Sequence, residues 1–308
     1  MLVLSPFNNS TECQQISCVK SAEIIEAYKV NFDQDVTRIF EGISEIGVYK
    51  CPITQLEFYY PFGLDGDSRF YEELSKSDWY YQQERWEHIQ VMKYITKGCK
   101  VLEIGSGRGA FASKLAAIGG MGYCGLELNM EAVNQAKASL LNVVCEDLKS
   151  HLKEHVSFYD VVCSFQVFEH VSSIRQLFED SISALKPNGL LIIAVPNNDA
   201  SFLKHNVLYS KYLNMPPHHV NLFTSSSLQN IGKFFKLELV SISNEPIQDM
   251  NVDTYLYNMV NKFFLNMTFL TRVFWKLKLH VPLRAIVKVR RQSIKGHTVM
   301  AVFRKTVL

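Results

Sequence analysis

A glycine-rich turn that follows an apolar stretch constrains this sequence more than any other feature. Residues 101–104 read Val-Leu-Glu-Ile, and Gly105, Gly107 and Gly109 come next, before a helical stretch. Glycine adopts left-handed backbone conformations without steric cost and lets the chain approach a ligand closely. In open α/β sheets, a turn of this kind lies at the carboxyl end of a strand, where ligands bind. The sequence therefore predicts a strand, a ligand-binding turn and a helix in succession.

Short apolar stretches alternate with amphipathic helical stretches around this turn. We expect strands at residues 100–104, 122–127, 142–145, 159–164, 189–195, 237–243 and 297–305, and helices at about 109–118, 130–140, 148–154 and 173–185. Asn129 and Thr224 are suitable N-cap residues, and Lys-Pro-Asn-Gly at 186–189 predicts a helix stop and a turn. The alternation predicts an α/β fold, in which helices cover both faces of a mostly parallel sheet.

Acidic residues beside the glycines narrow the choice of ligand. The glycine pattern also occurs in dinucleotide-binding folds, so the glycines alone leave a dehydrogenase open. Glu103 precedes the first glycine by two residues, where it would repel a pyrophosphate but attract the ammonium group of an amino acid. Glu127 ends the next strand, where a carboxylate suits ribose hydroxyls. Glu146 and Asp147 end the third strand, where a carboxylate can accept a hydrogen bond from an adenine amino group.

Five motifs, in order over about residues 85–245, together resemble class I S-adenosylmethionine-dependent methyltransferases. They are Leu-Glu-Ile-Gly-Ser-Gly-Arg-Gly at 102–109, Gly-Leu-Glu at 125–127, Glu-Asp at 146–147, Phe-Glu-His-Val at 168–171 and Leu-Lys-Pro-Asn-Gly-Leu at 185–190. The Phe-Glu-His-Val form is similar to the small-molecule branch, which includes ubiquinone-type O-methyltransferases. The resemblance implies a Rossmann-like sheet of seven strands in the order 3-2-1-4-5-7-6, with the last strand antiparallel, and S-adenosyl-L-methionine as the cofactor.

The resemblance also implies which residues contact the cofactor. Glu103 and the glycine turn would hold the methionine portion, Glu127 the ribose and Asp147 the adenine ring. In the aromatic run at 79–81, Tyr80 or Tyr81 would cover the sulfonium, because aromatic faces attract cations; the alternative is a core position. The predicted cofactor-binding set is Glu103, Gly105, Ser106, Gly107, Gly109, Glu127, Leu128, Glu146, Asp147, Leu148, Gln166 and Tyr81.

Three histidines are the candidates for chemistry on the methyl acceptor. A hydroxyl acceptor must lose its proton, and histidine suits that task near neutral pH. His170 lies just beyond the fourth strand, and His218 and His219 lie in Pro-Pro-His-His at 216–219, which resembles a segment found in many methylases of this branch. In the alternative, His170 bonds to backbone at a helix start and the other two brace their loop. The Asn/Asp-Pro-Pro-Tyr turn of adenine and glutamine methylases is missing, as is the paired-glutamate loop of arginine methylases.

No metal site is predicted. The adjacent histidines and Glu169 leave metal-dependent O-methylation as a minor option, because ligand geometry is not read from sequence. A structural zinc at Cys51 is not expected, because Thr54 stands three positions later, where a second cysteine would be needed.

Two segments lie outside the repeating strands and helices. Residues 1–84 are predicted to be an N-terminal cap on the substrate side, and residues 85–308 the methyltransferase domain, with an insertion at 250–295. The insertion contains nine Lys or Arg and one acid, Asp253, and therefore carries a net charge of +8. Its aromatic and aliphatic residues predict a basic, amphipathic helical lid. Its basic residues form either a solvated face or a surface that binds anionic lipid or phosphate. In the second case, residues 262–291 would contact the membrane.

Composition limits the partners. The net charge of +2 argues against nucleic acid. The longest apolar run, 189–195, is too short to span a bilayer. No secretory signal is recognised, so the predicted location is cytoplasmic, with peripheral membrane association as an option.

The predicted function is transfer of a methyl group to a hydroxyl, or a carbon, of a small molecule, glycan precursor or lipid-linked metabolite. The alternatives are a non-catalytic S-adenosylmethionine-binding module and a peripheral-membrane methylase of an isoprenoid or lipid. No oligomeric state is predicted.

Overall fold

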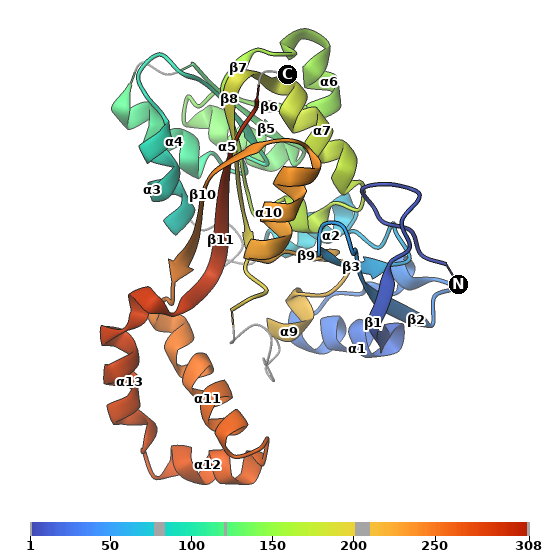
Figure 1. Cartoon of the computed structure of the whole chain (residues 1–308), viewed down its shortest axis with the longest axis vertical. Helices are drawn as coiled ribbons and strands as arrows, with labels where there is room; N and C mark the ends of the chain where they lie inside the picture. The colour runs from blue at the N-terminus through green and yellow to red at the C-terminus, as the bar shows by residue number, and fades with distance from the viewer. Residues whose placement is uncertain (1, 77–83, 120–121, 201–209, 307–308) are drawn as a thin grey trace.

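The computed structural model describes residues 2–76, 84–119, 122–200 and 210–306. Within these residues the chain forms a seven-stranded sheet and a separate four-stranded sheet. Figure 1 shows the large sheet and its helices in the upper body, the small sheet beside them near the N-terminus, and an arm of three helices that extends downward.

The seven-stranded sheet has the order expected from the sequence. Its strands are β4 (Lys100–Ile104), β5 (Gly122–Glu127), β6 (Val143–Cys145), β7 (Tyr159–Phe165), β8 (Leu185–Pro196), β10 (Glu238–Pro246) and β11 (Lys295–Arg304). Across the sheet they run β6-β5-β4-β7-β8-β11-β10, which is 3-2-1-4-5-7-6 when these strands are counted along the chain. β11 pairs antiparallel with β8 and β10, and the strands from β6 to β8 pair in parallel. The Rossmann-like fold class is therefore confirmed.

Helices cover both faces of this sheet. They are α3 (Trp86–Val91), α4 (Ala110–Ile118), α5 (Met130–Ala138), α6 (Leu148–His155), α7 (Ile174–Ala184) and α10 (Ser225–Phe234), with short turns η2 (Met92–Tyr94) and η3 (Phe168–His170). One apolar cluster packs Phe178 of α7 with Val162 of β7, and another packs Phe111 of α4 with Val161. Because neighbouring strand residues point to opposite faces, β7 is buried from both sides.

Two predicted N-caps are confirmed, and one predicted turn is not. Asn129 accepts hydrogen bonds from the first turn of α5, and Thr224 forms a capping box with Ser227 at the start of α10. The predicted helix stop is confirmed, because α7 ends at Ala184, but the predicted turn at 186–189 is wrong, because these residues lie within β8, which begins at Leu185. Asn188 N donates to Lys305 O, and Lys305 N donates to Gly189 O, so this segment is bonded to the residue that follows β11. The pairing of β7 with β8 shifts register here, because Tyr159 pairs with Leu185 whereas Val161 pairs with Leu190.

The N-terminal segment forms the four-stranded sheet. Its strands are β1 (Gln14–Lys20), β2 (Glu45–Lys50), β3 (Glu57–Tyr60) and β9 (Asn221–Leu222), and its helical elements are α1 (Ser21–Phe32), η1 (Thr37–Phe40) and α2 (Ser68–Leu74). The strand β9 comes from far along the chain, soon after α9 (Ser210–Leu213), and it pairs with β3. The two sheets are therefore joined through the segment that contains the predicted histidines 218 and 219.

The basic insertion forms the arm. Its helices are α11 (Val252–Phe263), α12 (Thr268–Lys276) and α13 (His280–Val289), flanked by the short turns η4 (Asp249–Asn251) and η5 (Arg291–Ser293). The arm leaves the body between β10 and β11 and extends away from both sheets (Figure 1) instead of folding over the glycine-rich turn as a lid. None of the helices in the described part of the chain is long and apolar enough to span a membrane.

Phe7→Ala should strongly destabilise the protein. Phe7 is fully buried in the main core, where its ring lies 5.7 Å from that of Phe234 and 6.2 Å from that of Phe235. Removing a buried aromatic side chain costs about 3–5 kcal/mol, which denaturant unfolding measures. Leu2→Ala is the control, since Leu2 is exposed, and it should cost less than about 0.5 kcal/mol. A similar cost for both variants would contradict the packing of Phe7.

Candidate active site

The glycine-rich turn after β4 has the left-handed backbone that its composition predicts. Gly105, Gly107 and Gly109 have φ values of 74°, 53° and 79°, a region that other residues adopt only with strain. Space is also restricted, because a Cβ on Gly105 would lie 2.4 Å from Val167 Cγ2. The turn therefore packs directly on the loop that follows β7.

Glu127, at the end of β5, holds the turn from the other side. Its Oε2 accepts a hydrogen bond from Gly107 N at 2.8 Å, and its Oε1 accepts from Leu128 N at 2.8 Å and Asn129 N at 2.9 Å. A carboxylate offers about four acceptor positions, so capacity remains for a ligand hydroxyl. The structure thus brings two members of the predicted cofactor-binding set into contact.

Beneath the turn lie two buried polar groups. Glu103 is 3% exposed, and its Oε2 accepts a hydrogen bond from the Tyr123 hydroxyl. Burial raises the pKa of Glu103 to about 8. The Ser106 hydroxyl is buried and has no hydrogen-bond partner among the described residues. Buried polar groups are usually satisfied, so an unpaired hydroxyl at the turn favours a polar ligand there.

The residues predicted to bind the cofactor at the end of β6 differ in how far their side chains are already bonded or buried. Asp147 caps α6, since its Oδ1 accepts from Ser150 N and its Oδ2 from Ser150 Oγ, both at 2.9 Å. These bonds lower the pKa of Asp147. Glu146 Oε2 lies 3.0 Å from His151 Nδ1. Leu148 is buried, whereas Leu128, at the end of β5, is 72% exposed. Leu128 is therefore an exposed apolar side chain at this edge.

Gln166 directly follows β7 and contacts a carboxylate that the sequence does not single out. Its Nε2 lies 3.3 Å from Glu87 Oε1 and 3.5 Å from Thr298 Oγ1. Glu87, in α3, is 3% exposed, and burial raises its pKa. No motif marks Glu87, because its helix lies outside the five recognised segments. The predicted Tyr81 lies outside the described residues.

The three predicted histidines converge from two segments. The ring centroids of His170 and His218 are 4.6 Å apart, and those of His218 and His219 are 4.4 Å apart. Burial lowers the pKa of His170 to about 4 and lowers the pKa of His218 and His219 well below the usual range. All three rings are therefore neutral near pH 7.

Hydrogen bonds fix the orientation of these rings. His170 Nδ1 donates to the carbonyl of His218, and His218 Nδ1 donates to Leu213 O at 3.0 Å. His219 Nδ1 lies 2.9 Å from Asn214 Oδ1 and donates to it. The alternative interpretation, in which His170 bonds to backbone and the other two brace the loop, therefore has support in these contacts. It is compatible with a further role, because the Nε2 atoms take no part in them.

Two further groups lie at this cluster: Glu169, which the sequence leaves as a minor option for a metal site, and Tyr71, which the sequence does not single out. Glu169 is 1% exposed, and neither of its carboxylate oxygens has a hydrogen-bond partner among the described residues. Its Oε1 lies 3.7 Å from His170 Nε2, and burial raises the pKa of Glu169 to about 8. Tyr71, which follows the N-terminal sheet, packs its ring 5.6 Å from that of His170. The N-terminal segment therefore contributes to the surroundings of the histidines.

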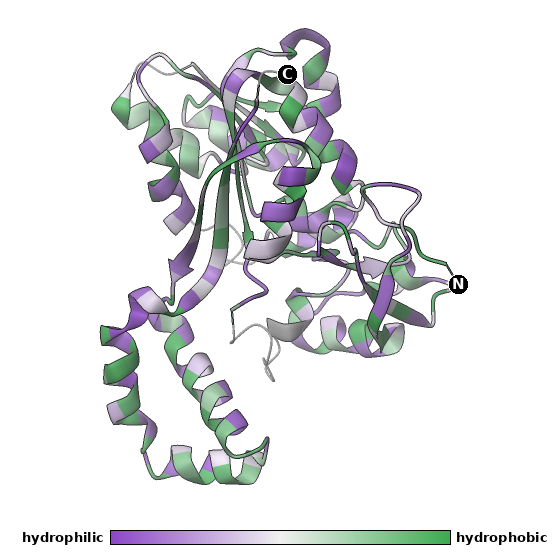
Figure 2. Cartoon of the chain, viewed as in Figure 1, coloured by the Kyte–Doolittle hydropathy of each residue, from purple (hydrophilic) through white to green (hydrophobic). Residues whose placement is uncertain are grey.

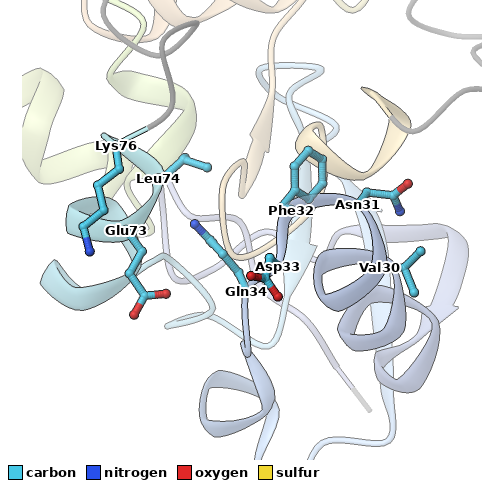
Figure 3. A pocket seen from close by; sticks show the side chains of 8 residues that line it. All are labelled: Val30, Asn31, Phe32, Asp33, Gln34, Glu73, Leu74 and Lys76. Carbon is cyan, nitrogen blue, oxygen red and sulfur yellow. The ribbon is translucent and has the colours of Figure 1, made fainter.

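A separate pocket lies within the N-terminal segment. Figure 3 shows it between the end of α1 and the end of α2. It is lined by Val30, Asn31, Phe32, Asp33, Gln34, Glu73, Leu74 and Lys76. None of these residues belongs to the glycine turn or to the histidine cluster, so the pocket is distinct from the predicted cofactor site.

Glu103→Gln should alter the pH dependence of stability. The pKa of Glu103 is raised from its usual 4.5 to about 8 in the folded chain, so the folded state binds the proton more tightly than the unfolded state. The stability that this proton contributes is complete below the unfolded pKa and is lost as the pH rises through about 8. Relative to the native chain, Glu103→Gln should therefore gain up to about 1.4 kcal/mol per pH unit between about pH 5 and 8.

Urea unfolding at a series of pH values measures this difference. Glu131→Gln, an exposed position on α5, is the matched control and should show a difference that does not change with pH. The same flat profile for Glu103→Gln would mean that Glu103 is ionised in the folded protein.

Comparison with known proteins agrees with this geometry. A methyltransferase-domain family matches residues 87–242, about half of the 308-residue chain. A ubiquinone biosynthesis O-methyltransferase of Shewanella sp. (strain ANA-3) is 27% identical over 122 residues, which cover 38% of this chain and 51% of that protein. One of the same description from Pectobacterium carotovorum subsp. carotovorum (strain PC1) is 26% identical over 176 residues, which cover 54% of this chain and 70% of that protein. The chain thus spans about half the length of the first of these relatives.

A solved structure supports the fold. The S-adenosylmethionine-dependent methyltransferase of Archaeoglobus fulgidus shares 20% identity and a TM-score of 0.50, over 76% of this chain and all of that chain. The family match contains the glycine turn, Glu127, Asp147 and His170. The predicted family, and S-adenosylmethionine as the cofactor that goes with it, are confirmed, whereas the roles of individual residues stay predictions. The chain belongs to the methyltransferase-domain family.

Proposed function

We propose that this protein transfers the methyl group of S-adenosylmethionine to a hydroxyl, or a carbon, of a small molecule. The observation that carries the proposal is the contact between Glu127 and Gly107 N at 2.8 Å. It fixes a ribose-binding carboxylate against a left-handed glycine turn at the carboxyl ends of β4 and β5. The similarity to ubiquinone biosynthesis O-methyltransferases supports an oxygen acceptor.

The residues at this edge fit the proposed cofactor. In this assignment Glu103 and the turn bind the methionine portion, with Ser106 Oγ as an unpaired polar group that a ligand can satisfy. Glu127 receives the ribose hydroxyls, and the exposed Leu128 packs against the adenine ring. Asp147 keeps its capping bonds to Ser150 and offers its remaining acceptor positions. When bound, the cofactor supplies a methyl group on a positively charged sulfur.

The histidine cluster defines the acceptor side. Val167 packs on Gly105, and His170 N bonds to Val167 O at 2.9 Å, so the cluster is tied to the cofactor turn through one short loop. Neutral rings with Nδ1 bound to oxygen acceptors present Nε2 as a proton acceptor. Deprotonation of a hydroxyl by such a nitrogen, and exclusion of water by the surrounding aromatic residues, suit an in-line methyl transfer.

Glu127→Ala should abolish cofactor binding. Calorimetric titration with S-adenosylhomocysteine should give micromolar affinity for the native chain and at least about 100-fold weaker binding for the variant, because two charge-assisted hydrogen bonds are lost. Glu127→Gln retains one acceptor oxygen and the shape of the side chain, so it tests the charge if the alanine variant fails to fold. Glu131→Ala on α5 is the control and should bind normally.

The outcomes separate three interpretations. Unchanged affinity in both Glu127 variants would mean that the ribose assignment is wrong. No binding by the folded native chain would exclude the proposed cofactor. Binding without transfer to any compound in a screen of hydroxylated acceptors would favour the non-catalytic module.

A second candidate function is methylation at an anionic membrane surface, with the arm as the membrane contact. Phe263, Leu265 and Phe269 are 78%, 81% and 72% exposed, and Figure 2 shows hydrophobic residues along α11, α12 and α13, well away from the body. Exposed apolar area of this kind is rare on proteins without a partner. Lys276 and Lys278 are exposed beside it. Apolar residues mixed with cations suit the interface of a bilayer that contains anionic lipid.

Replacing arm lysines should weaken binding to anionic vesicles. Each lysine near such a surface contributes about 1 kcal/mol, so Lys276→Ser with Lys278→Ser should lower the partition coefficient by about 30-fold in a sedimentation assay at low salt. Lys137→Ser with Lys149→Ser removes the same charge from exposed positions on α5 and α6 and should have little effect. A native chain that ignores vesicles rich in phosphatidylglycerol at low salt would rule out the membrane function.

A further inference from the structure

The histidine cluster has the donor set of a metal site. We propose that His170, His218, His219 and Glu169 bind one divalent cation of the zinc type on the acceptor side of the site. Its part in methyl transfer rests on the function proposed above, but its binding does not, because cation binding is measurable without cofactor or acceptor.

The first argument is the convergence of ring nitrogens. One nitrogen from each of the three rings lies within 4.8 Å of the others, and the centroids of His170 and His219 are 5.0 Å apart. Ligand atoms around a tetrahedral zinc with bonds of 2.0–2.1 Å are roughly 3.3 Å apart. A shift of each ring nitrogen toward the centre by about 1 Å would therefore bring the three nitrogens to the separation that a tetrahedral zinc requires.

The second argument is the tautomer that the surroundings impose. Each Nδ1 faces an oxygen that can only accept, namely His218 O, Leu213 O or Asn214 Oδ1. Each Nδ1 therefore carries the hydrogen, and each Nε2 carries the lone pair that a metal requires. Asn214 is itself held, because its Nδ2 donates to Asn198 Oδ1 at 2.7 Å. Metal-binding histidines are usually oriented by such outer hydrogen bonds.

The third argument is the unpaired carboxylate. Both oxygens of Glu169 are buried without a hydrogen-bond partner among the described residues, which is costly for a polar group away from water. Glu169 Oε1 is 3.7 Å from His170 Nε2, so it lies beside the His170 nitrogen that carries the lone pair. A cation there would satisfy the carboxylate and the lone pairs together.

The ligand chemistry indicates the class of cation. Three imidazoles and one carboxylate suit zinc, cobalt or nickel better than magnesium or calcium, which prefer oxygen ligands. With three histidines as ligands, a further position can be taken by Glu169 or by an oxygen of the acceptor. With the three Nε2 atoms bound to the cation, no ring of the cluster would act as the base. The cation would instead position the acceptor hydroxyl beside the cofactor turn and favour loss of its proton.

Zinc and cobalt titrations of the full chain test the site. After dialysis against a chelator and reloading with zinc chloride, the native chain should retain one equivalent of zinc by elemental analysis. The cobalt-loaded chain should show the visible absorption of a low-coordinate site. His218→Asn with His219→Asn should lose the bound metal. Glu169→Gln should weaken zinc binding by about 10-fold to 100-fold.

His280→Asn is the matched control, because His280 lies in the arm and stacks on Trp275; it should retain one equivalent. S-adenosylhomocysteine binding by each variant shows whether the fold persists. If the double variant does not fold, the zinc affinity of Glu169→Gln and the cobalt spectrum of the native chain test the cation site. A native chain that retains no zinc, or a folded double variant that retains one equivalent, would overturn the site. Zinc binding without S-adenosylhomocysteine binding would leave the site standing and remove the proposed function.

Discussion

The contact between Gly105 and Val167 sets the geometry of the whole site. A side chain at Gly105 would lie 2.4 Å from Val167 Cγ2, so the turn after β4 and the loop after β7 touch without room for adjustment. The turn carries the groups assigned to the cofactor, and the loop continues through Glu169 to His170. Methyl transfer requires donor and acceptor in line, and small displacements cost rate. In the proposed function, this close contact between the segments that follow two neighbouring parallel strands holds the donor and acceptor sides in a fixed relation.

Burial has a common electrostatic effect on this edge of the sheet. Burial raises the pKa of Glu103 and Glu169 to about 8 each and lowers the pKa of His170 to about 4. These groups are therefore largely uncharged near neutral pH, and some of their acceptor atoms have no partner. Such arrangements cost stability and are typical of functional sites. A ligand that brings positive charge, such as an ammonium, a sulfonium or a metal ion, would give these acceptor atoms a partner.

Local signals made the large sheet and the cofactor edge predictable. Left-handed glycines, apolar strands and the N-caps Asn129 and Thr224 each act within a few residues, so sequence spacing is enough to place them. The start of β8 at Leu185 is not predictable in this way, because it depends on pairing with Tyr159 of the neighbouring strand β7. The two-residue strand β9 gives no periodic signal. His170 and His219 were predicted separately, but their convergence depends on Val220 N bonding to Glu169 O at 2.8 Å, a contact between distant segments.

The arm and the N-terminal sheet, which lie outside the seven-stranded sheet, both reach the same edge of that sheet. β10 and β8 both pair antiparallel with β11, so β10 ends, and the arm begins, at the same edge as the carboxyl ends of β4 and β7. The N-terminal sheet reaches this edge through Val220, whose carbonyl accepts from Tyr59 N at 2.9 Å. The segment that supplies His218 and His219 is thus bonded to the N-terminal sheet on one side and to the loop after β7 on the other. In the proposed function the sheet supplies the cofactor contacts, so selectivity for the acceptor would arise from these added segments. An acceptor drawn from a lipid surface at the arm would arrive at the edge where the histidines converge.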